Sequence, residues 1–97
     1  MSSRQQLTEA EKIAETLGVV LGAASCCDSV TEERLSSVVP KLRHLLMSTA
    51  NDGADAEAAN DRFATAVDAG RIAAESGKID PEEAEDALSE LENQLMT

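Results

Sequence analysis

Hydrophobic residues recur every three or four positions through most of this chain, which is the spacing of helices that bury one face. A first helix is predicted over about residues 9–25. Thr8 and Glu11 have the spacing of a capping box at its start.

The end of this helix, from Leu17 to Ala24, is apolar nearly all round. Such a segment is either buried in the centre of the molecule or part of a subunit interface. Gly18 and Gly22 lie one turn apart in it and would let a neighbouring backbone approach, which we interpret as packing rather than as a dimer motif.

A second helix is predicted to begin after Thr31, or after Ser29 with Glu32, and to run to Thr49. Pro40 falls inside it and should either kink the helix, with the proline facing solvent, or split it into two. The apolar stripe of this helix is the clearest in the chain and consists of Leu35, Val38, Val39, Leu42, Leu45, Leu46 and Thr49.

A third helix follows the turn signal at residues 51–53, with Asp55 as the expected cap. It should run to Ser76 and stop at Gly77. Its inward stripe is made mostly of small residues, which predicts close contact with another helix: Ala56, Ala59, Phe63, Ala66, Val67, Gly70 and Ala74.

A fourth helix has the strongest start signal, with Asp80 as cap and Pro81 at the first helical position. The connection over residues 77–79 is short, so the third and fourth helices are expected to form an antiparallel hairpin. The buried edge of the fourth helix comprises Ala84, Ala87, Leu88, Leu91 and Leu95.

These elements predict an all-α fold, a single helical domain over residues 8–97 with a flexible N-terminus at residues 1–7. The bundle has four helices, or five if Pro40 splits the second. Its core must be thin, because the chain has sixteen alanines and Phe63 is its only aromatic residue. A homodimer through the first helix, or through the small-residue face of the third, would compensate for such a core.

Acidic residues are concentrated in the second half of the chain. Residues 1–50 carry five Lys/Arg and six Asp/Glu, whereas residues 51–97 carry three and thirteen, so that the halves contribute −1 and −10 to the net charge of −11. A field of one sign repels nucleic acid and anionic lipid and attracts basic protein surfaces.

The residues needed for catalysis or for metal binding are scarce. His44 is the single histidine and is expected to be exposed, and the chain has no CxxC pair and no glycine-rich phosphate loop. We therefore expect no enzyme activity, no catalytic residues, no cofactor and no metal. Cys26 and Cys27 fit small apolar residues near a helix end better than a redox thiol, since the nearest charge, Asp28, has the wrong sign.

Lys41, Arg43 and His44 form the only basic cluster, and no aromatic residue lies beside it. Direct nucleic-acid binding is therefore not expected. These side chains are expected to meet acids of the third or fourth helix, or of another subunit.

Helical projection places a row of acids on the third helix and a cluster on the fourth, opposite the apolar stripes. The predicted partner-binding residues are Glu57, Asp61, Asp68, Glu75, Glu82, Glu83, Asp86 and Glu90. Such acids either solvate the domain or dock a basic groove, where carboxylates can replace the phosphates of a nucleic acid.

The docking interpretation predicts a non-enzymatic regulator or inhibitor that masks a basic, nucleic-acid-binding surface of another protein. Phage-encoded inhibitors, anti-CRISPR proteins among them, work in this way, and the chain matches that class in size and charge only. The alternative is a homo-oligomeric assembly module or an accessory subunit. No apolar stretch is long enough for a membrane span, and a cytoplasmic location is expected.

Overall fold

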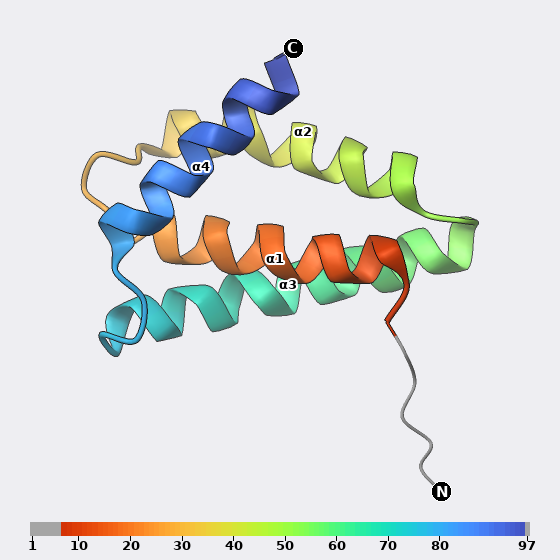
Figure 1. The fold of residues 1–97 in the computed structure, drawn as a ribbon, viewed down its shortest axis with the longest axis horizontal. Helices are drawn as coiled ribbons and strands as arrows, with labels where there is room; N and C mark the ends of the chain where they lie inside the picture. Colours follow the sequence, from red (N-terminus) through yellow and green to blue (C-terminus); the bar gives the residue numbers. More distant parts are fainter. Residues whose placement is uncertain (1–6, 97) are drawn as a thin grey trace, which may run out of the picture.

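The computed structural model describes residues 7–96 and contains four helices, α1 (Glu9–Ala24), α2 (Glu32–Thr49), α3 (Gly53–Glu75) and α4 (Pro81–Met96) (Figure 1). No strand occurs within these residues, so the predicted all-α class is confirmed. The predicted flexible N-terminus lies outside the described residues except for Leu7, which is half-buried.

The starts of α1 and α2 follow the predicted capping signals. The Thr8 hydroxyl accepts a hydrogen bond from the Glu11 N–H at 3.2 Å, and the Glu11 carboxylate accepts one from the Thr8 N–H at 3.1 Å. Thr31 caps α2 by accepting from the Arg34 N–H at 3.1 Å. Pro40 is exposed inside α2 and does not split it.

The expected cap of α3 was wrong, because Asp52 and not Asp55 takes this role. Asp52 is extended (φ −158°) and accepts the Asp55 N–H at 2.8 Å, since it lies just outside the first turn that Asp55 already belongs to. The Asp55 carboxylate accepts the Asn51 N–H at 2.9 Å and the Thr8 hydroxyl at 2.6 Å instead. It thereby ties the start of α1 to the α2–α3 turn.

The end of α3 is a Schellman turn built on Gly77. Gly77 has a φ of 81°, a conformation that glycine adopts without strain. The Lys78 N–H reaches back to the Ala73 carbonyl at 2.8 Å, and the Gly77 N–H reaches the Ala74 carbonyl at 3.2 Å. The helix therefore stops at Glu75, one residue earlier than predicted.

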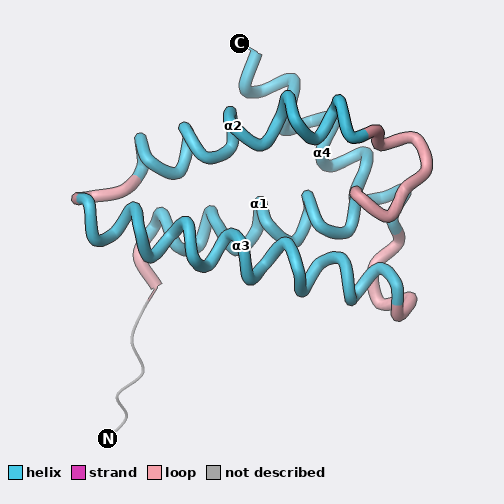
Figure 2. Tube along the Cα trace, turned by 180° about the vertical axis from the view of Figure 1, so that it is seen from behind, coloured by secondary structure: helices cyan, strands magenta, loops and turns pink. Residues whose placement is uncertain are grey.

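The closest helix contact joins α1 and α3, which lie side by side in the front and back views (Figures 1 and 2). Glycines make this approach possible. A Cβ atom on Gly22 would lie 1.9 Å from the Val67 carbonyl oxygen, and one on Gly70 would lie 2.2 Å from the Val19 carbonyl oxygen. The interpretation of Gly18 and Gly22 as packing residues thus holds within a single chain.

The two remaining helices lie over α1, and the expected hairpin of α3 and α4 is not confirmed. After the Gly77 turn, α4 rises away from α3 and packs across α1 (Figure 1). The physical reason is that the only apolar stripe of α3 is already in contact with α1. The apolar edge of α4, with Ala84 and Leu88 buried, therefore meets the other side of α1.

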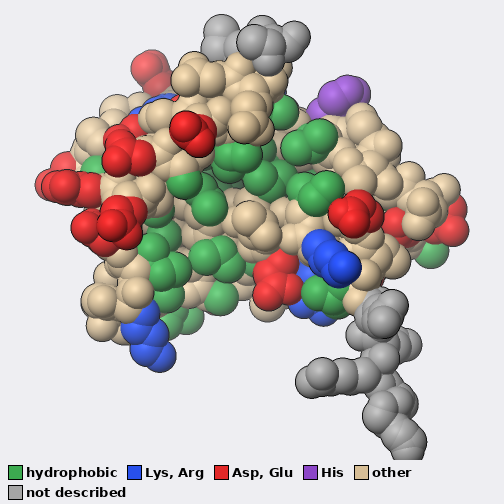
Figure 3. Space-filling view, viewed as in Figure 1, with side chains coloured by type: hydrophobic (Ala, Val, Ile, Leu, Met, Phe, Trp, Pro, Cys, Tyr) green, Lys and Arg blue, Asp and Glu red, His purple; other side chains and the backbone are tan. Residues whose placement is uncertain are grey.

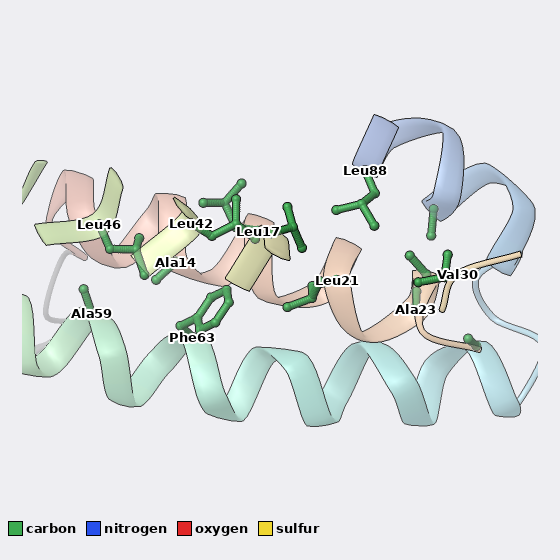
Figure 4. Packing of buried hydrophobic residues seen from close by; sticks show 14 of the residues in the cluster. Ala14, Leu17, Leu21, Ala23, Val30, Leu42, Leu46, Ala59, Phe63 and Leu88 are labelled. Carbon is green, nitrogen blue, oxygen red and sulfur yellow. The ribbon is translucent and has the colours of Figure 1, made fainter. Parts of the chain in front are cut away.

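The core lies where α1 meets the other three helices (Figure 4). Its largest fully buried side chains are Val38, Leu42, Leu46 and Leu88, and Phe63 is 3% exposed. Figure 4 shows Phe63 pointing from α3 towards the leucines. The molecule is flat, with extents of 42 × 33 × 17 Å, so the core is as thin as the composition predicts.

Candidate functional site

The eight predicted partner-binding acids are all exposed, and they fall on two separate surfaces. The acidic row of α3 consists of Glu57, Asp61, Asp68 and Glu75. The acidic cluster of α4 consists of Glu82, Glu83, Asp86 and Glu90. Because α3 and α4 do not pack as a hairpin, the row and the cluster are not neighbouring ridges of one unit. Figure 3 shows acidic side chains gathered over α4 on one broad face of the molecule.

The acids that pair with the half-buried Arg34 are not among these eight. Arg34 of α2 donates to Glu85 at 2.8 Å, to Glu92 at 2.6 Å and to the Ser89 hydroxyl at 2.8 Å. The hydrogen bonds to Glu92, and then to Glu85, raise the pKa of Arg34. The bonds from Arg34, and then from Ser89, lower the pKa of Glu85. This bridge is a polar connection between α2 and α4.

A second arginine joins the close pair of helices. The Arg62 guanidinium of α3 lies 3.1 Å from the Glu15 carboxylate and 3.8 Å from the Glu11 carboxylate, both on α1. Arg71 pairs with Asp68 along α3, and this contact raises the pKa of Arg71. Asp68 is the one predicted acid that forms an ion pair within residues 7–96.

The basic cluster of α2 does not meet acids of α3 or α4 within the described residues, and its pairing with another subunit stays a prediction. Lys41, Arg43 and His44 are exposed, and no carboxylate of α3 or α4 in the described chain lies within ion-pair distance of them. Arg34, about two turns before Lys41 in α2, is the cation that pairs with acids of α4. Sequence reasoning overlooked Arg34, although its place at the start of the α2 stripe put it near the core.

An open cleft of about 580 Å³ lies where the end of α1 meets the start of α4. Cys26 and Cys27 line it, half-buried and unpaired. The Cys26 thiol lies 3.7 Å from the Arg71 carbonyl oxygen, and the Cys27 thiol lies 3.1 Å from the Ser29 hydroxyl. The other lining residues are mostly acidic: Asp28, Ser29, Asp80, Pro81, Glu82, Glu85 and Asp86. No sequence signal joined Asp28 to α4, because only the crossing of the helices brings them together.

Comparison with known proteins assigns no family, since no protein-family model, curated protein or solved structure matches the chain. Within residues 7–96, no helix is both long enough and apolar enough to cross a membrane.

Proposed function

We propose that this protein is a non-enzymatic regulator or inhibitor that binds another protein and masks a basic surface of the kind that binds nucleic acid. One observation carries the proposal. All eight predicted acids are exposed, and seven of them have no ion-pair partner in the described chain. The half-buried arginines are neutralised by Glu11, Glu15, Glu85 and Glu92, which are not among the eight.

This division supports a surface left negative rather than one balanced internally. An exposed carboxylate without an ion-pair partner in its own chain remains available to a partner's Lys or Arg. It also raises the rate at which an oppositely charged protein approaches. The separation into two surfaces means that a single flat partner would contact the α3 row or the α4 cluster, whereas a groove could enclose both.

The test is capture of the partner from the native host with the wild-type protein and with a charge-reversed variant as bait. Reversing Asp61, Asp68, Asp86 and Glu90 to Lys should leave the helical circular dichroism spectrum unchanged, because all four side chains are exposed. The same change should abolish capture, since each new lysine repels a basic surface. The captured partner should also lose nucleic-acid binding when the wild-type protein is added.

Salt provides the control for this experiment. Capture through charge should weaken steeply between low and high ionic strength. Capture that is equal for the two baits and insensitive to salt would mean that the acids only solvate the domain. The alternative of an assembly module or accessory subunit would then be favoured.

A homodimer through the end of α1 or the small face of α3 receives no support from the fold. Those faces pack against each other within one chain, and Leu17, Leu21, Ala23 and Ala24 are buried. Self-association therefore requires a different surface.

A further inference from the structure

An apolar groove of about 340 Å³ runs over α1 between α2 and α4. It is lined by Lys12, Ile13, Thr16, Leu17, Leu45 and Leu91. Figure 3 shows hydrophobic side chains gathered in the middle of this broad face, below α4. Leu45, Leu91 and Ile13 are only half-buried, so that the bundle leaves part of its leucine surface open to solvent.

The rim of the groove is charged asymmetrically. Lys12 lines it on the α1 side, and Lys41 shares a flank of α2 with Leu45, one turn away. Both lysines are exposed, and neither has a carboxylate within ion-pair distance in residues 7–96, although the chain carries nineteen acids. On the other side of the apolar patch, acidic side chains cover α4 (Figure 3).

We propose that this face is the contact surface of a homodimer, formed by a second copy of the chain through a two-fold axis over the groove. A two-fold axis brings this patch of one copy against the same patch of the other. Each side of the patch then faces the opposite side of the patch in the second copy. The apolar grooves then cover each other, and the acidic cluster of α4 in each copy approaches the lysine rim of the other. Contacts between lysine and acid at the rims then offset part of the repulsion between two chains of net charge −11.

This dimer goes beyond the proposed function, because it needs no basic partner, but the two share a surface, since both use the acidic cluster of α4. It covers the acidic cluster of α4 and leaves the acidic row of α3 facing outward. A dimer that forms while partner capture fails, or the reverse, would separate the two proposals.

The first experiment is sedimentation of the wild-type protein from about 1 μM to about 200 μM, where a dimer of twice 10.2 kDa is expected. Thr16→Glu places a carboxylate on an exposed position of the groove and should raise the dissociation constant about 100-fold or more. Thr65→Glu makes the same change at an exposed position of α3 and should leave the dimer intact. A monomeric wild type, or equal behaviour of the two variants, overturns the proposal.

The second experiment tests the exchange of charged rims. One variant carries Glu83→Lys and Glu90→Lys, and the other carries Lys12→Glu and Lys41→Glu. Each alone should dimerise about tenfold more weakly than the wild type, because like charges meet at the rim. A one-to-one mixture should recover the wild-type dissociation constant, since every lysine again faces an acid.

The matched control mixes the Lys12→Glu, Lys41→Glu variant with one that carries Asp61→Lys and Asp68→Lys in the row of α3. This mixture has the same total charge, but the second variant keeps the wild-type rim and should dimerise only with itself. The Lys12→Glu, Lys41→Glu variant should therefore dimerise as weakly in this mixture as it does alone. A first mixture as weak as its components, or a control mixture in which the Lys12→Glu, Lys41→Glu variant recovers equally well, overturns the two-fold arrangement.

Discussion

Two pairs of helices in this molecule are held by different means. The inner pair, α1 and α3, meets backbone to backbone at Gly18, Gly22 and Gly70. The outer helices, α2 and α4, rest on α1 through buried leucines and are joined to each other by the Arg34 bridge. A backbone contact has no side chain that can move aside. A contact between leucines can repack, at a cost that depends on how well the site closes.

The difference also explains where the molecule is open. Small residues bring the backbones of α1 and α3 into contact at three glycines, whereas the larger side chains of α2 and α4 hold those helices farther from α1. The apolar groove lies over α1, and Lys12 of α1 lines it. The surfaces proposed for binding are therefore shared: the inner pair carries the acidic row of α3 and most of the groove lining, and the outer helices carry the acidic cluster of α4 and the two leucines at the sides of the groove.

Gly22→Ala should have the largest effect on stability, because its Cβ would lie 1.9 Å from the Val67 carbonyl oxygen and 2.9 Å from the Arg71 backbone nitrogen. We expect a loss of about 3 kcal/mol or more in the free energy of unfolding, measured by urea titration. Gly53→Ala is the control, since nothing lies within 4 Å of its added atom. Equal midpoints for Gly22→Ala and the wild type would mean that the inner pair is not in backbone contact.

Leu88→Ala tests the outer side at its best-buried position, since Leu88 is 0% exposed and attaches α4 to the core. The expected loss is about 3 kcal/mol in the free energy of unfolding, from lost burial and the cavity left behind. Leu88→Met should cost much less, because the volume is nearly kept. An alanine variant as stable as the wild type would show that α4 contributes little to the fold.

Arg34→Ala should cost less, about 1–2 kcal/mol in the free energy of unfolding, because the bridge is partly exposed to solvent. A double-mutant cycle with Glu92→Gln measures the coupling between α2 and α4 directly. Additive losses would show that the bridge does not join the two helices.

The smallest expected effect is a change in the pH dependence of stability at the start of the inner pair. Hydrogen bonds from the Thr8 hydroxyl, and then from the Asn51 N–H, lower the pKa of Asp55. A carboxylate whose folded pKa is lowered contributes stability above its unfolded pKa of about 3.9, and this contribution is lost as the pH falls through the folded pKa.

The corresponding measurement is Tm between about pH 6 and pH 2 for the wild type and for Asp55→Asn. The variant should show a flatter fall at the acidic end, because its amide does not titrate. Asp61→Asn serves as the control on the same helix, since Asp61 is exposed and its carboxylate has no hydrogen bond or ion pair within the described chain. Identical curves for all three proteins would contradict the role of the Thr8–Asp55 contact.

Local signals in the sequence predicted the helices well. Thr8 with Glu11, and Asp80 with Pro81, mark helix starts through contacts that span a single turn, and Gly77 marks an end in the same way. The exposure of all eight predicted acids followed from periodicity, because each lies opposite an apolar stripe. The cap of α3 was the exception, since Asp55 was expected in this role and the turn geometry gives it to Asp52.

Local patterns in the sequence do not determine which helices pack against each other. A short connection between α3 and α4 favoured a hairpin, but Gly18, Gly22 and Gly70 bring α1 against α3 and occupy the stripe that the hairpin needed. Pairing of charges followed the same long-range contacts. Arg34 and not the Lys41 cluster reaches α4, because the crossing of the helices sets these distances.

The sequence alone therefore specified the fold class, the helix limits to within a few residues and the acidic character of the surface, since each depends on neighbours within about one helical turn. Tertiary structure decided that the acids form two separate surfaces, that an apolar groove stays open over α1 and that Lys12 at its rim has no ion-pair partner within residues 7–96. Those features arise from contacts between residues far apart in the chain, where shape complementarity selects among several pairings that the hydrophobic pattern permits equally.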